Sequence, residues 1–566
     1  MTDLRRTVLW VIFTMSLVLI WDAWNKHNGQ PSMFGGVART APAGSAPATP
    51  PAALPATVPA AGDVPAASAT PGATPAATAT PLASTAVPAG ERVTVTTDLF
   101  KATLDATGGS LVHLELLNHR DLIDPTRNTV LFDQSAKRLY VAQTGLITGA
   151  AGVALPNHLT KMTLVPGERT LQAGADELKL VFESPVVDGH QLIKTYIFRR
   201  GDYSIGVRHE LINNGSTALT PQLYLQLARD GNPPEGESSV YSTFTGPAMY
   251  TDASKFKKIA FKDIDKDKAD HDKSATDGWI AIVQHYFTSA WLLPGNQPRE
   301  FRTAKVADNH YTIAMVTSLG EVAPGARKVQ EATLFAGPQE EKHLAELAPG
   351  LELVKDYGWL TILAKPLFWL LDKLHGVIGN WGWSIVALVV LLKIAFYWLN
   401  ASAYKSMAKM KAVGPRVAEL RERLKDKPQQ MQAEMMRIYR EEKVNPLGGC
   451  LPIVVQMPFF IALYWVLLST VEMRNAPWIW WITDLSAKDP WFILPVVMTL
   501  SSLFQVWLNP KPPDPMQAKM MWIMPLAFSF MFFFFPAGLV LYWVTNNILS
   551  IAQQWFINKR LGVLTK

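Results

Sequence analysis

Four long apolar stretches in the C-terminal third most constrain what this chain can fold into. Each is close to the length of about 20 residues that a helix needs to cross about 30 Å of hydrocarbon. A soluble protein can bury one such helix, but hardly four in series. We therefore expect transmembrane helices over residues 383–399, 451–471, 491–508 and 522–544.

The N-terminus adds a fifth apolar stretch. Arg5 and Arg6 precede an apolar run over 8–20, and Trp21 and Trp24 stand where an interfacial belt would lie. No small-residue cleavage site follows directly, so residues 1–25 are expected to be an uncleaved transmembrane anchor. The next segment, 26–90, is rich in Ala, Pro and Thr and predicts a disordered linker. The chain is thus predicted to be an α-helical polytopic membrane protein with five transmembrane helices.

Residues 91–350 have the period-two alternation of β-strands. Phe100, Ala102 and Leu104 fall on one face of a strand, and the residues from Tyr203 to Leu211 alternate in the same way. Many strands with recurrent turn signals predict a large β-sandwich. The polar residues on these strands are expected to face solvent; they include His113, Glu115, His209 and Glu210.

The segment 351–380 predicts an amphipathic helix that lies in the membrane interface. Between Asp356 and Gly379, six apolar residues form a stripe, and Pro366 suits a first helical position. The stripe consists of Leu367, Phe368, Leu370, Leu371, Leu374 and Ile378. Burial of this helix against the sandwich is the alternative.

Flanking charge predicts the topology. Between 400 and 446 the chain has eleven Lys and Arg residues, whereas the loop 472–490 has only Arg474 and Lys488. By the positive-inside rule the first loop is cytoplasmic and the second is periplasmic. We expect a protein of the bacterial inner membrane with a cytoplasmic N-terminus, a periplasmic segment 26–380 and a short cytoplasmic tail over 559–566. The net charge of +6 comes without a compact basic motif interleaved with aromatic residues, so no nucleic-acid binding is expected.

The cytoplasmic loop 401–446 is itself predicted to be a helical hairpin. Apolar residues recur at three-and-four spacing before and after a break at Lys427-Pro428. They include Met407, Met410, Val413, Val417, Leu420, Met431, Met435 and Ile438. Met-rich faces can serve as adaptable contact surfaces, but the spacing fits packing of the hairpin on itself equally well.

Lys393 is the residue that most departs from its surroundings, because it is a cation inside the stretch 383–399. A charge at the bilayer centre costs about 2.5–3.5 kcal/mol on insertion scales, so it usually faces a bundle interior or a wet cavity. No Asp or Glu lies well inside another apolar stretch. We expect water around Lys393 and a transient anionic partner.

Other residues of the apolar stretches are candidates for the same site. Polar candidates for lining a groove are Gln456, Gln505, Thr545, Asn546 and Asn547, for each of which interhelical hydrogen bonding is the alternative. Apolar candidates for a surface along which a substrate helix slides are Met457, Phe460, Tyr464, Phe532 and Trp543. For these residues, contact with lipid is the alternative.

Ordered motifs across residues 355–560 resemble those of the YidC membrane protein insertase family. They are the stretches 379–384 (GNWGWS), 404–410 (YKSMAKM), 445–452 (NPLGGCLP), 456–458 (QMP), 514–517 (DPMQ) and 535–543 (FPAGLVLYW). The preceding anchor, linker and β domain are similar to the Gram-negative form of that family. The resemblance implies a conserved core over 381–558 and a periplasmic β-supersandwich.

The resemblance also implies a hydrophilic groove that is open to the cytoplasm and to lipid but closed to the periplasm. The family places one positive residue in the groove, typically Arg, and Lys393 occupies that position here. The function implied is insertion and folding of nascent membrane proteins, alone or with the Sec translocon. The hairpin 402–443 is the expected ribosome contact, and the lipid bilayer is the remaining partner.

Two other functional classes fit parts of the sequence. A secondary transporter also places a charge in a bundle, but no repeat of paired spans and no coupling carboxylate is visible. A membrane-anchored periplasmic carbohydrate-active protein would need an acid and a base in the β domain. We expect no enzyme activity, no catalytic residues, no metal and no cofactor, and the nucleotide motif Gly-x-x-x-x-Gly-Lys-Ser/Thr is absent.

Overall fold

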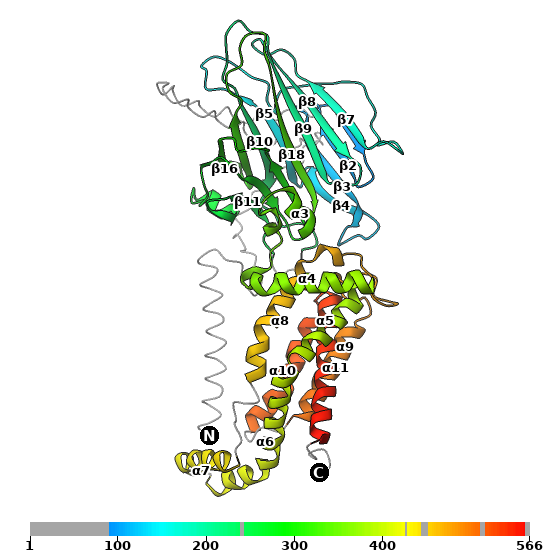
Figure 1. The fold of residues 1–566 in the computed structure, drawn as a ribbon, viewed down its shortest axis with the longest axis vertical. Helices are drawn as coiled ribbons and strands as arrows, with labels where there is room; N and C mark the ends of the chain where they lie inside the picture. The colour runs from blue at the N-terminus through cyan, green and yellow to red at the C-terminus, as the bar shows by residue number, and fades with distance from the viewer. Residues whose placement is uncertain (1–89, 238–242, 425–426, 443–450, 510–514, 561–566) are drawn as a thin grey trace, which may run out of the picture. The chain divides into compact units, whose positions relative to one another are not determined.

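The computed structural model describes residues 90–237, 243–424, 427–442, 451–509 and 515–560 (Figure 1). These residues form two compact units that divide at Lys355–Asp356. The predicted anchor 1–25, the predicted linker as far as residue 89 and the end of the predicted tail, 561–566, lie outside the described residues.

The unit that ends at Lys355 contains two nine-stranded antiparallel sheets. The first sheet has the strand order β1 (Arg92–Thr96), β2 (Phe100–Asp105), β3 (Ser110–Arg120), β4 (Asn128–Gln134), β5 (Leu139–Ile147), β10 (Gln222–Asp230), β17 (His310–Ser318), β16 (Arg299–Ala307), β13 (Ser274–Ala275). The second has the order β12 (Lys255–Lys258), β11 (Gly246–Thr251), β14 (Trp279–Val283), β15 (Phe287–Leu292), β18 (Arg327–Pro338), β9 (Ser204–Asn213), β8 (His190–Arg199), β7 (Glu177–Glu183), β6 (Thr163–Leu164). The predicted β-sandwich is therefore confirmed.

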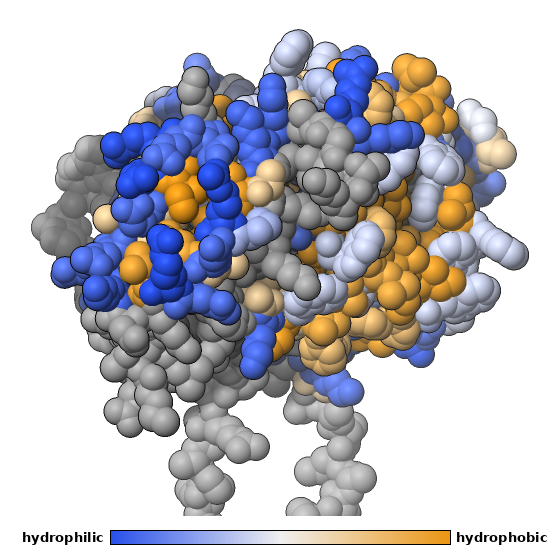
Figure 2. Space-filling view, turned by 90° about the horizontal axis from the view of Figure 1, so that it is seen from below, coloured by the Kyte–Doolittle hydropathy of each residue, from blue (hydrophilic) through white to orange (hydrophobic). Residues whose placement is uncertain are grey.

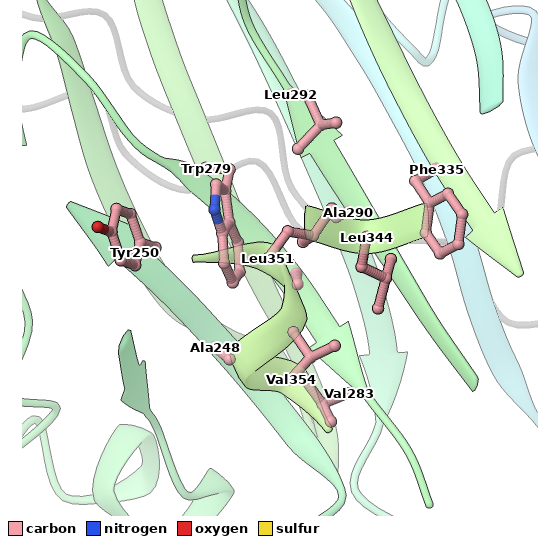
Figure 3. Close-up of a cluster of buried hydrophobic side chains, with 11 residues drawn as sticks. Ala248, Tyr250, Trp279, Val283, Ala290, Leu292, Phe335, Leu344, Leu351 and Val354 are labelled. Atoms are coloured by element: carbon pink, nitrogen blue, oxygen red, sulfur yellow. The ribbon is translucent and has the colours of Figure 1, made fainter. Parts of the chain in front are cut away.

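Part of the second sheet is covered by the last elements of this unit. The helix α3 (Glu341–Leu347) and the 3₁₀ turn η1 (Leu351–Val354) pack on β11, β14, β15 and β18 (Figure 3). Leu344, Leu351 and Val354 bring fully buried aliphatic side chains to Trp279 and Phe335. A short helix α2 (Phe261–Asp265) lies between β12 and β13 in the chain.

Period-two alternation predicted the inward faces of the strands correctly. Phe100, Ala102 and Leu104 are fully buried. The expectation that strand polar residues face solvent is wrong for His209, which is 1% exposed and lies on the buried face with Val207. Its ring reaches across to β5, where Nε2 lies 2.8 Å from Thr144 Oγ1, so a cross-sheet hydrogen bond compensates for its burial.

The unit that begins at Asp356 is helical. Its elements are η2 (Gly358–Leu360), α4 (Thr361–Ile378), α5 (Trp381–Ala395), α6 (Tyr397–Arg423), α7 (Pro428–Glu441), α8 (Leu451–Ser469), η3 (Val471–Met473), α9 (Ile493–Leu508), α10 (Pro515–Phe532) and α11 (Ala537–Arg560). The predicted stretches 451–471 and 491–508 correspond closely to α8 and α9. The described part of the predicted hairpin 401–446 contains α6 and α7, with Pro428 at the first position of α7.

The predicted amphipathic helix is shorter at its start than expected. The helix α4 begins at Thr361, so Pro366 lies inside it rather than at its first position. Leu367, Phe368 and Leu371 of the predicted stripe are buried, and α4 packs against α8 and α5. Its other side leaves Trp369 and Val377 exposed. One helix thus presents apolar residues both to its own unit and to its surroundings.

The predicted span 383–399 is bent. The helix α5 ends at Ala395 and α6 begins at Tyr397, and the two axes differ by 68°. Together this pair is long and apolar enough for a broken membrane span. Among the described residues, no single helix passes the same test of length and hydropathy; shorter apolar helices cover Val455–Ser469, Ile493–Leu508 and Ala518–Phe532.

The predicted single span 522–544 is wrong, because two helices occupy it. The amides of Phe534 and Phe535 bond three residues back, to Met531 and Phe532, which ends α10 in a tight turn. Pro536 then disfavours helical geometry at Phe535 and precedes α11. Five crossings from a cytoplasmic N-terminus would end in the periplasm, so the predicted five spans were inconsistent with the predicted cytoplasmic C-terminus.

The turn between α10 and α11 lies beside the loop 472–490. The amides of Ala537 and Gly538 donate to the carbonyls of Ala487 and Leu485, and Lys488 forms a β-bridge with Pro536. Both segments are therefore on the same side of the helical unit. Together with the predicted anchor 1–25, the extra helix would give the sixth crossing that a cytoplasmic C-terminus needs.

Candidate functional site

Lys393 lies on α5, two residues before the helix ends at Ala395. The Asn380 side chain caps the start of α5 by accepting a hydrogen bond from the Trp383 amide, at 3.1 Å. The helix is apolar nearly all round, which is typical of a buried or lipid-facing helix. The helix therefore holds a single cation among aliphatic neighbours.

The Lys393 ammonium is compensated by a neutral group. Nζ donates to the hydroxyl of Ser550 on α11, at 2.7 Å. Ser550 in turn donates to the carbonyl of Asn546, at 2.7 Å. Across the described residues no carboxylate forms an ion pair with Lys393. The described residues therefore hold this cation without neutralising its charge.

A cavity of about 60 Å³ opens beside this ammonium. At about 30 Å³ per molecule it has room for about two waters. Polar, aromatic and aliphatic residues from α5, α8, α11 and the bend after α5 line it: Val389, Leu392, Lys393, Phe396, Gln456, Phe459, Phe460, Tyr542 and Asn546. The ammonium, an amide from α8 and an amide from α11 thus converge on one small space.

The bend between α5 and α6 completes one wall of the site. It places Asn400 beside α8, where the Gln456 Nε2 donates to Asn400 Oδ1 at 2.8 Å. The Asn400 Nδ2 is buried and has no hydrogen-bond partner among the described residues. The contact between α6 and α8 is therefore made by two side-chain amides, each of which can donate and accept hydrogen bonds.

The structure brings together only some of the predicted groove residues. Lys393 and Gln456 share the cavity. Asn547 instead faces α9, where its Nδ2 donates to Ser502 at 2.9 Å and to Ser501 at 3.4 Å. Gln505 lies on α9, which packs on α10 and α11, and it is not part of the cavity lining. The interhelical alternative thus describes Asn547 better than groove lining does.

The predicted sliding surface contains an aromatic cluster between α8, α10 and α11. The Phe460 ring lies 4.3 Å from Trp543 and the Phe532 ring lies 4.8 Å from Trp543, both edge to face. Tyr464 joins through Phe535, at 6.2 Å. Phe460 also lines the cavity, so this cluster begins at the polar site. Met457 is 47% exposed and is not part of it.

Sequence reasoning missed three residues of this site: Ser550, Asn400 and Tyr542. A signal was present, because Tyr542, Asn546 and Ser550 recur every four residues and so share one face of a helix. This spacing was not recognised because the predicted span ended at Val544, so Asn546 and Ser550 were not assigned to any helix.

The loop 472–490 joins the helix ends on the side away from Asn400. Besides its bonds to Ala537 and Gly538, it accepts hydrogen bonds from the Asn380 side chain at the carbonyls of Pro477 and Trp478. Asp489 caps α9 by accepting from the Leu494 amide at 2.7 Å. The starts of α5, α9 and α11 are therefore held by one loop.

The hairpin carries exposed cations that the described residues do not neutralise. Val413 and Val417 pack against Met410 and Met435, so self-packing uses much of the predicted Met face. Arg416 pairs with Glu442, and Arg437 pairs with Glu434 and Glu441. Exposed cations without a carboxylate partner among the described residues remain: Lys405, Lys409, Arg423, Lys427 and Arg440. In Figure 2, hydrophilic residues gather at the left, where the hairpin lies in Figure 1.

The β unit holds its own buried polar groups. The Lys194 Nζ donates to the carbonyls of Gly108 and Thr144, both at 2.6 Å, and links the two sheets. Burial lowers the pKa of Lys194 to about 7. Burial and the nearby Lys194 lower the pKa of His209 to about 3. These are cross-sheet contacts rather than an acid and base exposed to a substrate.

A larger cavity of about 780 Å³ lies beside the edge strand β13. Arg299 on its wall is 2% exposed and donates to five backbone carbonyls, so it holds the surrounding loops. Asp272 on the same wall accepts from Ser254 and Thr251. The polar groups that line this cavity are engaged with the protein itself.

Comparisons with known proteins agree over the whole chain. Two family models match, the YidC periplasmic domain over residues 92–370 and the 60Kd inner membrane protein over residues 373–563. The membrane protein insertase YidC of Janthinobacterium sp. (strain Marseille) is 52% identical, over 99% of this chain and 100% of its own length. The membrane protein insertase YidC of Cupriavidus pinatubonensis is 55% identical, over 99% of this chain and 98% of its own length.

The likeness to solved structures is lower. A crystal structure described as an active YidC insertase with the first transmembrane domain resolved is 17% identical, with a TM-score of 0.38. The match covers 81% of this chain and 91% of that one. The sequence relatives are therefore what defines the family.

Proposed function

The chain belongs to the YidC family of membrane protein insertases, and from this membership we propose that the cavity beside Lys393 receives the polar flank of an incoming transmembrane segment. The protein is a multi-pass insertase of the inner membrane with a periplasmic domain. This identity excludes the secondary transporter and the carbohydrate-active protein. The step assigned to Lys393 is the new part of the proposal.

The observation that carries the proposal is the contact between Lys393 and Ser550. A buried cation is normally paired, because an isolated charge in an apolar environment is costly. Here the partner is a hydroxyl, and the remaining ammonium protons are available to a ligand in the cavity. A carboxylate on the substrate flank supplies the missing negative charge and forms a charge-assisted hydrogen bond.

The apolar part of the substrate is proposed to leave along the aromatic cluster. Phe460, Trp543 and Phe532 run from the cavity toward the contact of α8 with α10 and α11. Transfer of apolar groups from water to lipid contributes about 0.8 kcal/mol per CH₂, which can drive the exit of the segment. The membrane potential assists movement of an acidic flank to the periplasm.

The loop 472–490 is proposed to close the groove on the periplasmic side. Its bonds to the starts of α5 and α11 support this role, because opening there would require breaking four described hydrogen bonds. The polar flank then enters the groove and is held at the level of Lys393, and it does not pass through a continuous pore.

Two larger partners belong to the proposal. The hairpin α6–α7 is proposed to contact the ribosome, and its five exposed cations without a carboxylate partner among the described residues support this, since ribosomal RNA is polyanionic. The Sec translocon is proposed as a second partner on the basis of the family resemblance. Co-purification of the full chain with ribosomes and with the translocon tests the two partners separately.

The proposed role of Lys393 is tested with single-span proteins that have acidic or neutral flanks. Wild type and Lys393→Met are reconstituted in liposomes, and protease-protected product is measured. We expect Lys393→Met to slow the acidic substrate and to leave the neutral one nearly unchanged. Equal loss for both substrates would show that Lys393 acts through the fold rather than through charge.

A further inference from the structure

The groove contains a second recognition element that is independent of charge. We propose that Asn400, Gln456 and Gln553 bind main-chain N–H and C=O groups of the polypeptide in the groove. This proposal rests on the proposed function of the cavity. It identifies the main chain as the part of the substrate that the three amides bind.

The Gln456–Asn400 pair leaves hydrogen-bonding capacity unused. One N–H of Gln456 is given to Asn400 Oδ1, at 2.8 Å. The Asn400 amide nitrogen is buried and has no hydrogen-bond partner among the described residues. Asn400 itself is 5% exposed. A buried donor without a partner is uncommon in proteins, and a ligand that accepts its hydrogen bond would offset the cost of burying it.

Gln553 shows the same feature more strongly. Both polar atoms of its side chain are buried, and neither has a hydrogen-bond partner in the described structure. It lies on α11, seven residues after Asn546 and eleven after Tyr542, which both line the cavity. At 100° per residue these three positions fall within about 40° of one another. Gln553 therefore extends the face that lines the cavity toward the cytoplasmic end of α11.

Side-chain amides match the chemistry of a peptide bond. Each offers N–H donors and a carbonyl acceptor, as does the main chain of a substrate. A flank that is not helical carries unpaired main-chain groups, which are costly to bring to the depth of the bilayer. Lys393 can only donate, so it can satisfy a carboxylate or a carbonyl of the flank but not a main-chain N–H. Amides on α6, α8 and α11 can satisfy the main chain of any flank, whatever its side chains.

The test uses synthetic single-span peptides with a neutral flank of either glycine or sarcosine. Sarcosine is N-methylglycine, so it removes the main-chain N–H and adds only a methyl group. Insertion is measured in liposomes that contain the full chain. We expect the glycine flank to insert about fivefold faster in wild type, the effect of about one hydrogen bond. Equal rates for the two flanks in wild type would overturn the proposal.

The first variant is Gln553→Met, which keeps the side-chain length and breaks no hydrogen bond of the described structure. We expect it to raise the melting temperature, because a buried amide without a partner is removed, and to slow insertion of the glycine flank. The double variant Asn400→Leu with Gln456→Met should erase the difference between glycine and sarcosine. A purely structural role would lower the melting temperature and insertion together, and would contradict the proposal.

Lys393→Met and Thr499→Val complete the design. Among the described residues, the Thr499 hydroxyl has one hydrogen bond, to the carbonyl of Pro495 in its own helix, so Thr499→Val serves as the matched control and should retain both rates. Lys393→Met should keep the glycine preference while losing the acidic-flank preference. If Lys393→Met loses neither preference, the role of Lys393 fails and that of the amides stands. If the amide variants slow only acidic flanks, the amides act through Lys393 and this inference fails.

Discussion

The ammonium of Lys393 on α5 donates a 2.7 Å hydrogen bond to the hydroxyl of Ser550 on α11. The contact joins the first and last helices of the membrane core across 157 positions of sequence. It holds the cation in place without neutralising it. A substrate carboxylate can therefore compete for the ammonium at the cost of one neutral contact.

Ser550→Asp should abolish the attraction of Lys393 for an acidic flank while the lysine itself is retained. The new carboxylate would form an internal ion pair with the ammonium, and a flank carboxylate would no longer be attracted. We expect Ser550→Asp to insert acidic-flanked substrates as slowly as Lys393→Met does. The matched control is Ser550→Asn, which is neutral and close in size, and should stay within about threefold of wild type. Normal insertion of acidic flanks by Ser550→Asp would contradict this account of the site.

The break between α10 and α11 predicts that residue 534 is reached from the periplasm. Phe534 and Trp480 are both exposed, and their segments are joined by hydrogen bonds. In a Cys450→Ser background, Phe534→Cys and Trp480→Cys should both react with a membrane-impermeant maleimide added outside spheroplasts. Lys409→Cys on the hairpin should react only after permeabilisation. Protection of Phe534→Cys until permeabilisation would restore the single span 522–544.

Lys194 predicts a pH-dependent stability of the β unit. Its pKa is about 7 in the folded state against 10.5 for the free group. Between these values the unfolded chain binds a proton that the folded chain does not, so the free energy of unfolding rises with pH. The slope approaches about 1.4 kcal/mol per pH unit for one proton. Below pH 7 both states are protonated and the contribution is constant.

To test this, calorimetry is used to measure unfolding of the β unit in the detergent-solubilised full chain between pH 7 and pH 10. We expect the stability of wild type to rise with pH relative to Lys194→Met, in which the titrating group is absent. Parallel curves for the two proteins would show that Lys194 has the same pKa in the folded and unfolded states.

The exposed cations of the hairpin predict salt-sensitive binding of ribosomes. Replacing Lys405, Lys409, Arg423 and Lys427 by Glu should abolish co-sedimentation at low salt. Replacing the acid-paired Arg416 and Arg437 by Gln should have a smaller effect, because Glu442, Glu434 and Glu441 already neutralise them. Binding that persists in the Glu variant and is insensitive to salt would place the ribosome contact elsewhere.

The sequence predicted the elements whose signals are local. The alternation at Phe100–Leu104 gives β2, the apolar run after Cys450 gives α8, and Pro428 marks the start of α7. The break at Pro536 was missed because Phe532 to Phe535 continue the apolar run without a polar residue. Hydropathy reports how apolar a segment is, but a helix end depends on backbone geometry, for which the proline was the signal.

The partners within the site could not be predicted in the same way. Lys393 stands out because one charge in an apolar helix is costly, but Ser550 does not, since a serine in a helix can bond its own backbone. Pairing Gln456 with Asn400 depends on the 68° bend between α5 and α6, and no proline or glycine at residues 390–399 indicates it. His209 was misplaced because polarity was taken to imply exposure, whereas Thr144 on the facing sheet compensates for it.

Charge reversal at Lys393 tests the central claim most directly. Wild type and Lys393→Glu are reconstituted in liposomes without a membrane potential, and each is given single-span substrates with Asp, Asn or Lys in the flank. The account predicts that wild type inserts the Asp flank fastest and that Lys393→Glu inserts the Lys flank fastest, with the Asn flank similar in both. The same order of substrates in both proteins would contradict the claim that the groove attracts its substrate through the charge of Lys393.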